Sequence, residues 1–415
     1  MFGRLLRELN GSQGTPTANT MKDVSQAVNG TKIAYTLQST NRTTAFDLSS
    51  GIPASFSPVP LALPNTGDAI DWVTTNKAVV MSFNVNTPFL VDYSLSTVTA
   101  LGATGFALNA STKGQTIAGN MSTGVAMALA FSGGFVKVDS AGPTATALTN
   151  SSGVTPSCII VKPGTSSWIV GGSNGKFCQL DAAGNATSVT TLPTTPSNSV
   201  SPTAQNISHM AMDAGGSELF LSTTSGMLFH YSLVGPTFFY NSVTRIASSV
   251  PTTTDGVPLS NIVNGWMMHC QGDHASSVVP AGIWLRQIGR LPHIPADSIY
   301  LPSTNINIRA VGINPTANVG WIATTQGRIF VIDMTGLATT IGKERAQDPV
   351  GVDVAARLIT IQKFKYSMYR VESDISILAG PNNVALDLED HEYLSVASIN
   401  TPFVNEKIDI RQYSS

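Results

Sequence analysis

Short apolar runs alternate with polar turns along most of the chain, and one arrangement of them recurs. An apolar run, a turn with a glycine and a second apolar run follow one another in the same order at residues 168–181, 219–232 and 321–333. Glycine adopts the positive φ of a tight turn without steric cost, and the flanking aromatic and β-branched residues suit strands. A further apolar run ends in a turn 14 residues before each glycine. Each unit therefore holds at least three strands joined by tight turns.

The same unit is found at other places when asparagine is allowed at the turn, because asparagine also tolerates a left-handed conformation. The turn positions are then about 48 residues apart on average and fall at Asn41, Asn86, Gly124, Gly175, Gly226, Gly282 and Gly327. Repeats of 40–50 residues with four strands each are typical of a β-propeller. We therefore predict an all-β fold, a propeller of seven four-stranded blades over residues 21–345. A β-sandwich or a solenoid with irregular strands is the alternative.

Residues 1–20 differ from the repeats. Phe2, Leu5, Leu6 and Leu9 follow helical spacing, which predicts a short amphipathic helix. A Gly/Ser/Thr linker follows it. The segment is either an arm that docks a partner or neighbouring subunit through these four residues, or a helix folded back onto its own domain.

The last part of the chain is richer in charge. Residues 341–415 hold 19 of the 48 charged residues, although strand-like apolar runs continue. We predict a separate β module at residues 346–415, with a set of ring-closing strands as the alternative.

Composition restricts the class of protein. Charged residues make up only 12% of the 415 residues and the net charge is −2, so there is no general attraction to nucleic acid or to anionic membranes. No apolar run approaches the 18 residues of a spanning helix. Arg7 and Glu8 interrupt the N-terminal apolar residues, so we expect no signal peptide and synthesis in a cytosol. Three cysteines cannot all pair, which argues against a disulfide framework.

Candidate chemistry is sparse. Asp47, Asp92, Asp181 and Asp333 share one repeat position at a strand end, where an aspartate caps its own turn. The acidic segment around His391 is a candidate site for Ca²⁺ or Mg²⁺, but it lacks the glycine-containing calcium loop. One local cluster contains residue types that ligate Zn²⁺, but it lacks paired zinc-finger spacing: His269, Cys270, Asp273 and His274. Nucleophile-elbow, phosphate-loop and dinucleotide motifs are absent. The sequence therefore predicts neither an enzyme nor a cofactor or metal site.

By its repeats the chain resembles the β-propeller superfamily in general, without the kelch or Trp-Asp motifs. Its Thr/Ser/Gly/Asn-rich, sparsely charged composition, unpaired cysteines and short arm resemble virion structural proteins of tailed bacteriophages. This resemblance implies a non-enzymatic component of a tail, tail tip or surface decoration, located in the virion. Its partners would be other virion proteins, copies of itself, or a glycan or protein of the host surface.

Two alternatives remain at this point. The polar loops also suit an extracellular or surface propeller that binds or cleaves glycans. A cytosolic protein-interaction propeller fits the repeats but not the low charge.

Overall fold

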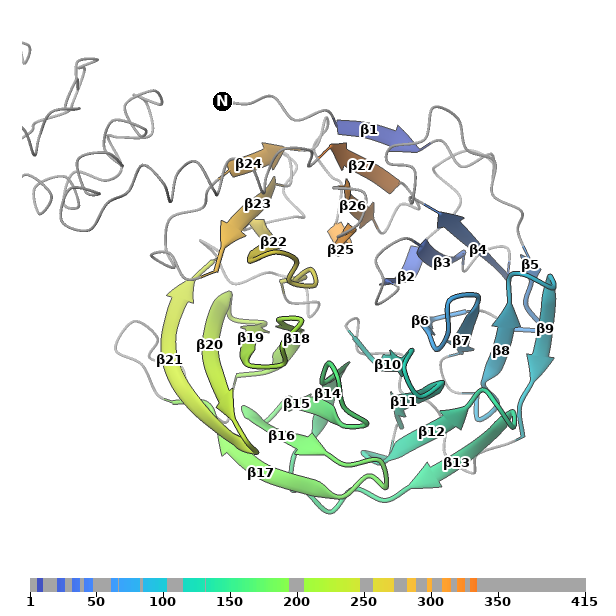
Figure 1. Ribbon diagram of the computed structural model, residues 1–415, viewed down its shortest axis with the longest axis horizontal. Coiled ribbons are helices and arrows are strands. Elements are labelled where there is room, and N and C mark those ends of the chain that lie inside the picture. The colour runs from blue at the N-terminus through green and yellow to red at the C-terminus, as the bar shows by residue number, and fades with distance from the viewer. Residues whose placement is uncertain are drawn as a thin grey trace, which may run out of the picture. The chain divides into compact units, whose positions relative to one another are not determined.

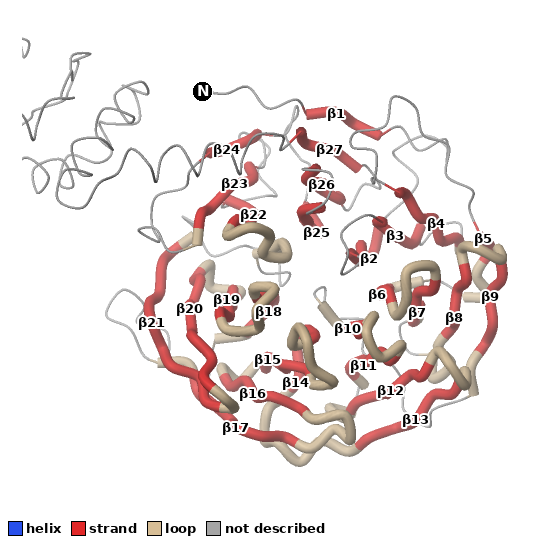
Figure 2. Tube along the Cα trace, viewed as in Figure 1, coloured by secondary structure: helices blue, strands red, loops and turns tan. Residues whose placement is uncertain are grey.

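The computed structural model describes residues 6–9, 21–26, 32–37, 41–47, 61–65, 67–82, 85–102, 115–130, 132–193, 205–246, 257–271, 282–288, 297–300, 308–314, 319–324 and 329–333. These residues belong to one compact unit, Arg4–Met334. Every regular element among them is a β-strand (Figure 2), which confirms the predicted all-β class. The predicted C-terminal module at residues 346–415 lies outside the described residues and stays a prediction.

Five sheets each consist of four consecutive antiparallel strands. Their strands are β2 (Met21–Gln26), β3 (Lys32–Leu37), β4 (Arg42–Asp47) and β5 (Leu61–Ala62); β6 (Ala69–Trp72), β7 (Lys77–Met81), β8 (Phe89–Asp92) and β9 (Thr97–Ala100); β10 (Ile117–Asn120), β11 (Val125–Leu129), β12 (Phe135–Asp139) and β13 (Thr144–Leu148); β14 (Pro156–Val161), β15 (Trp168–Gly172), β16 (Lys176–Leu180) and β17 (Ala186–Thr191); β18 (Ile207–Met212), β19 (Glu218–Thr223), β20 (Met227–Val234) and β21 (Thr237–Arg245).

Two further sheets are built differently. One has three strands and the other combines strands from both ends of the unit. Their strands are β22 (Trp266–Gln271), β23 (Gly282–Gln287) and β24 (Asp297–Tyr300), and then β1 (Leu6–Leu9), β27 (Ile329–Asp333), β26 (Val319–Thr324) and β25 (Ile308–Asn314). The prediction of seven four-stranded blades is therefore wrong in its count, because five sheets are complete blades of consecutive strands.

The sheets are arranged around a common centre like the blades of a propeller (Figure 1). The first strand of each complete blade lies nearest the centre and the fourth lies outermost. First strands of successive sheets contact one another from β2 through β6, β10 and β14 to β18, and β25 contacts both β22 and β2. This confirms a propeller-like architecture.

Residues 6–9 of the N-terminal segment form a strand and not part of the predicted helix. In β1, Leu6 pairs with Ile332 and Leu9 with Ile329 of β27, so β1 forms the outer strand of its sheet. A helix of about ten residues is marginal in water by itself, whereas the exposed edge of β27 offers unpaired backbone groups. Phe2 and Leu5 lie outside the described residues, and docking of a partner through this segment stays a prediction.

The hydrophobic core lies in layers between neighbouring sheets. Trp168, Val170 and Cys178 of one blade pack with Met127 and Phe135 of the preceding blade. The opposite face of the same blade packs against the next blade through another cluster of buried side chains. Alternation along a strand sends successive side chains to opposite faces, so each blade contributes to two layers. This packing makes each blade depend on its neighbours for burial.

Two side-chain amides tie inner strands of different sheets together. The Gln115 amide donates to the Met210 carbonyl at 2.9 Å and accepts from the Met210 N–H at 2.8 Å. Asn261 makes the same pair of hydrogen bonds with Ile313, both at 2.8 Å. Such paired bonds satisfy backbone groups that an inner edge strand leaves open.

Three of the seven turn positions expected from the repeat are confirmed, and Gly327 lies outside the described residues. Asn41 (φ 48°), Gly175 (φ 68°) and Gly226 (φ 77°) have positive φ and connect the second and third strands of their blades. Asn86 does not have positive φ, and Gly282 is the first residue of β23 rather than a turn residue.

One turn position was assigned to the wrong hairpin. Gly124 has a positive φ of 72°, but it connects β10 with β11, the first two strands of its blade. Gly133 (φ 82°) occupies the equivalent turn between the second and third strands. Asp139 lies six residues after Gly133, as Asp181 does after Gly175, so Asp139 belongs to the repeated aspartate position.

Candidate functional site

The third strand of the complete blades ends at a repeated position, six residues after the turn residue. Asp92, Asp139 and Asp181 occupy this position, and each accepts hydrogen bonds from backbone N–H groups two to four residues ahead, at 2.8–3.1 Å. The hydrogen bonds from Asn185 lower the pKa of Asp181 below its usual range. These contacts confirm the predicted turn-capping role.

Ser232 holds this position in the fifth complete blade, β18–β21. The shorter hydroxyl side chain does not stop the strand there, and β20 continues to Val234. With eight residues in β20 and nine in β21, this hairpin is the longest in the described part of the chain. Its extension places two apolar side chains in solvent, Val234 at 66% and Phe239 at 51% exposure.

The surface of this blade carries a connected group of polar side chains. The Glu218 carboxylate lies 2.5 Å from His230 Nε2 and accepts from the Ser232 hydroxyl at 3.3 Å. The Asn241 amide donates to Ser232 Oγ at 2.7 Å. Asn241 lies in the bulge where the pairing of β20 and β21 shifts, which turns its side chain toward this group.

Apolar side chains lie on the same face of the sheet. Phe220 pairs with His230 across β19 and β20, and their rings stack with centroids 4.3 Å apart. Phe239 pairs with Ser232 across β20 and β21. We call this surface the His230 face; it consists of Glu218, Phe220, His230, Ser232, Val234, Phe239 and Asn241.

The polar side chains of the His230 face form a connected network that can bind a ligand. The Ser232 hydroxyl donates to the Glu218 carboxylate, which also engages His230, and it accepts from the Asn241 amide. Hydrolysis of a glycosidic bond needs two carboxyl groups on either side of it, and Glu218 is the single carboxylate of this face. The side chains hold one another in fixed positions, which favours recognition of a ligand.

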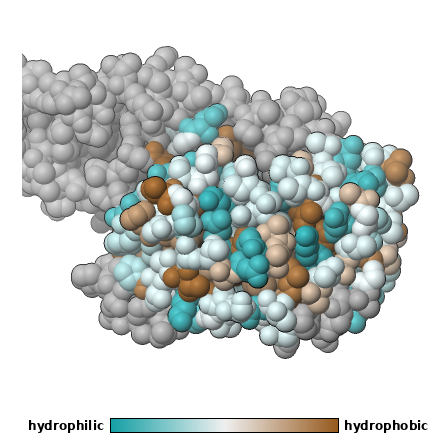
Figure 3. All heavy atoms as spheres, turned by 60° about the horizontal axis from the view of Figure 1, so that its bottom comes forward, coloured by the Kyte–Doolittle hydropathy of each residue, from teal (hydrophilic) through white to brown (hydrophobic). Residues whose placement is uncertain are grey.

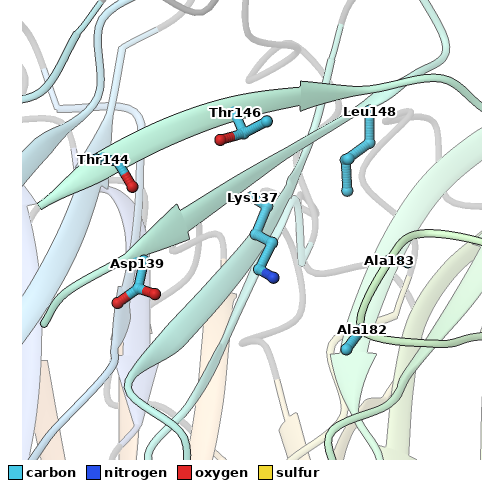
Figure 4. A pocket seen from close by; sticks show the side chains of 7 residues that line it. All are labelled: Lys137, Asp139, Thr144, Thr146, Leu148, Ala182 and Ala183. Atoms are coloured by element: carbon cyan, nitrogen blue, oxygen red, sulfur yellow. The ribbon is translucent and has the colours of Figure 1, made fainter. Parts of the chain in front are cut away.

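A polar groove lies at the equivalent place on another blade (Figure 4). Lys137 lies four residues after Gly133, as His230 does after Gly226. The groove has a volume of about 280 Å³ and is lined by Lys137, Asp139, Thr144, Thr146, Leu148, Ala182 and Ala183. Thr144 and Thr146 come from β13, beside Lys137 and Asp139 of β12. Unlike the His230 face, this groove has no aromatic side chain in its lining.

Outside the His230 face and the polar groove, the surface combines hydrophobic and hydrophilic residues. On the face that Figure 3 brings forward, hydrophobic residues form small groups separated by hydrophilic ones. Three of the five large hydrophobic side chains that are exposed in the described part belong to the β20–β21 hairpin: Val234, Phe239 and Tyr240. Apolar exposure is therefore concentrated on this hairpin.

The two candidate metal ligands within the described residues, His269 and Cys270, do not face a common site. His269 and Cys270 are neighbours on β22 and pair with Trp284 and Ile283, so their side chains point to opposite faces. Asp273 and His274 lie outside the described residues. Among the described residues, no group of three His, Cys, Asp or Glu side chains is placed to hold a metal ion.

Both ring nitrogens of His269 have protein partners. Nδ1 lies 2.9 Å from the Cys270 carbonyl, and Arg286 Nε donates to Nε2 at 3.2 Å. Complete burial, together with the Arg286 guanidinium, lowers the pKa of His269 to about 3. Burial also lowers the pKa of Arg286 to about 10. His269 is therefore a neutral structural side chain, with Nδ1 as its N–H donor.

We expect the stability of the protein to depend on pH through His269. An unfolded histidine has a pKa of 6.5 and the folded one about 3. Between these values the unfolded chain binds a proton that the folded chain does not. The free energy of unfolding therefore falls as the pH falls, by up to about 1.4 kcal/mol per pH unit. Urea unfolding between about pH 7 and about pH 4.5 should give a shallower pH slope for His269→Gln than for the wild type, and equal slopes would contradict this account.

The three cysteines are free, in keeping with the expected absence of a disulfide framework, and all three are buried. Cys158, Cys178 and Cys270 form no disulfide, and Cys178 packs in the core. Burial raises the pKa of Cys158 to about 12 and that of Cys178 to about 11. Thiols with such pKa values are poor nucleophiles and poor metal ligands at neutral pH.

The His230 face is not among the sites predicted from the sequence. One signal was present: Ser232 stands where the other repeats have aspartate, and this departure marks the longer hairpin. The position of Glu218 and Asn241 beside His230 depends on strand pairing and on a bulge, which the sequence pattern does not show.

Comparison with known proteins adds no relative. No protein-family model matches the chain, and a search of curated proteins finds no match. Among the described residues there is no helix that is long and apolar enough to span a membrane. A propeller-like fold by itself does not indicate function, so function has to be inferred from the chemistry of the molecular surface.

Proposed function

We propose that this protein is a non-enzymatic structural component of a virion, whose ring of blades serves as a rigid scaffold that presents an adsorption surface. The observation that carries the proposal is the His230 face, where fixed polar groups lie beside exposed apolar side chains. Binding sites generally combine such a small number of oriented polar groups with apolar surface. The sparse charge and the high Thr, Ser and Asn content support a virion component by resemblance.

We further propose that the three-stranded sheet and the sheet that contains β1 close the ring beside the five complete blades. Residues 258–260 run beside β22, with hydrogen bonds from Ser260 N to the Met268 carbonyl at 2.9 Å and from Cys270 N to the Pro258 carbonyl at 3.3 Å. This segment occupies the place of a first strand. The sheet that β1 completes has four strands already. A closed ring leaves no long exposed edge at either end of the repeat array.

Binding to intact bacterial cells tests the adsorption role. Fluorescently labelled full-length protein should bind at least one member of a panel of cells with different envelopes, and the double variant Val234→Ser/Phe239→Ser should lose this binding. Leu95→Ser is the matched control, because Leu95 is 71% exposed on a different blade. Failure to bind any cell type, or equal binding by the double variant, would contradict the proposal.

The second candidate is a surface propeller that binds or cleaves glycans. The carboxylate of Glu218 and the amide of Asn241 favour its binding form, because both are frequent partners of hydroxyl groups. The single carboxylate of the face does not favour cleavage. Chromatography of an oligosaccharide mixture after incubation with the protein separates the two forms.

A further inference from the structure

We propose that the His230 face binds a neutral pyranose saccharide, with the sugar ring covering Phe239 and its hydroxyl groups hydrogen-bonded to Asn241, Ser232 and Glu218. This inference rests on the proposed function, since it names the chemical class of ligand that the adsorption surface takes. It concerns binding alone and involves no covalent step.

The polar groups offer donors and acceptors close together. Asn241 Nδ2 is engaged with Ser232, whereas no hydrogen bond to the Asn241 amide oxygen is found in the described part of the chain. The Glu218 side chain is 32% exposed and that of His230 22%. Adjacent sugar hydroxyls each donate and accept, so an amide oxygen and a carboxylate on one face can receive two of them.

The apolar part of the face suits the C–H-rich side of a sugar ring. Phe239 is 51% exposed and lies on the same side of the sheet as Ser232. Its neighbour Phe238 is buried in the core, which fixes the strand that carries Phe239. Covering an exposed phenyl ring removes apolar surface from water, and Val234 extends this surface at the hairpin end.

Charge and size select among ligand classes. The His230 face contains neither lysine nor arginine, the residues that recognise phosphate and carboxylate groups, so an anionic ligand would meet Glu218 without a cation. Its exposed apolar part consists of two side chains. A stable protein–protein interface needs roughly 800 Å² from each partner, which is much more than two side chains provide. A small neutral polyhydroxyl ligand matches both properties.

The equivalent groove on the β10–β13 blade is an internal comparison. It has threonine hydroxyls and Asp139 but no aromatic ring. Saccharide binding at the His230 face uses both an exposed aromatic ring and oriented polar groups. The groove lacks the aromatic ring, so we expect it not to bind the same ligand. Thr146→Ala in the groove is therefore a matched control for substitutions in the His230 face.

A glycan array probed with the full-length protein tests the proposal, followed by calorimetric titration of the best-bound oligosaccharide. We expect binding to neutral saccharides. Phe239→Ser should weaken the affinity roughly tenfold or more, Asn241→Ala should weaken it as well, and Phe239→Tyr should retain it. Thr146→Ala and Leu95→Ser should leave the affinity unchanged.

The outcomes separate this inference from the proposed function. A silent array, binding restricted to acidic saccharides, or an affinity that Phe239→Ser leaves unchanged would overturn the saccharide site. If the protein at the same time binds intact cells through Val234 and Phe239, the adsorption role stands with a different ligand. Thermal unfolding of each variant verifies that the exposed substitutions leave the fold intact.

Discussion

Removal of residues 1–10 is expected to lower the free energy of unfolding by on the order of 4 kcal/mol. The truncation deletes β1, whose residues Leu6–Leu9 pair with β27. Each backbone hydrogen bond contributes about 1 kcal/mol net. The four paired residues of β1 allow about four such hydrogen bonds. The exposed edge of β27 should also promote association between chains. Urea unfolding followed by circular dichroism measures the loss.

A shorter truncation is the control. Removal of residues 1–5 deletes Phe2 and Leu5 but leaves β1 intact, so the unfolding midpoint should stay close to that of the full-length protein. Equal destabilisation by both truncations would show that pairing of β1 is not the cause. Equal stability of all three chains would show that the strand contributes nothing to closing the ring.

Trp168→Ala is expected to cost about 3–5 kcal/mol of folding stability. Trp168 is 1% exposed and fills the layer between two blades, where it packs with Met127 and Phe135 of the preceding blade. Its indole Nε1 donates to the Ala118 carbonyl at 3.1 Å. The substitution removes both the large side chain and a hydrogen bond between blades.

Phenylalanine substitutions separate these two contributions. Trp72 is also fully buried, but its Nε1 has no hydrogen-bond partner in the described structure. Trp168→Phe should therefore cost about 1–2 kcal/mol more than Trp72→Phe, although both lose similar volume. Denaturant unfolding of the two variants gives the difference. A larger cost for Trp72→Phe would contradict the assigned role of the Trp168 indole.

Local turn chemistry made much of this fold predictable. Asn41, Gly175 and Gly226 were recognised because a left-handed turn residue between two apolar runs has a steric requirement that sequence displays. Gly124 satisfied the same requirement in the wrong hairpin, since each blade contains several turns of similar chemistry. A second repeated residue is needed to assign a turn to the correct hairpin of the blade. Asp139, which lies at the same repeat position as Asp181, is that residue.

Long-range pairing limited the prediction elsewhere. The apolar residues of the N-terminal segment fit helical spacing, but the strand that they form depends on β27, more than 300 residues away. The His230 face likewise joins Glu218, Ser232 and Asn241 from three strands. A pattern read along the chain shows which residues can face one way, whereas pairing and bulges decide which of them meet.

Titration of a neutral oligosaccharide with the full-length protein, followed by proton NMR of the sugar, tests the central claim most directly. We predict that wild-type protein broadens the sugar signals, that Phe239→Ser protein does not, and that no new anomeric signal appears in either sample. Equal broadening by both proteins would show that the saccharide does not bind at the His230 face. New anomeric signals that grow with time would show that the protein cleaves glycans and is not a non-enzymatic adsorption component.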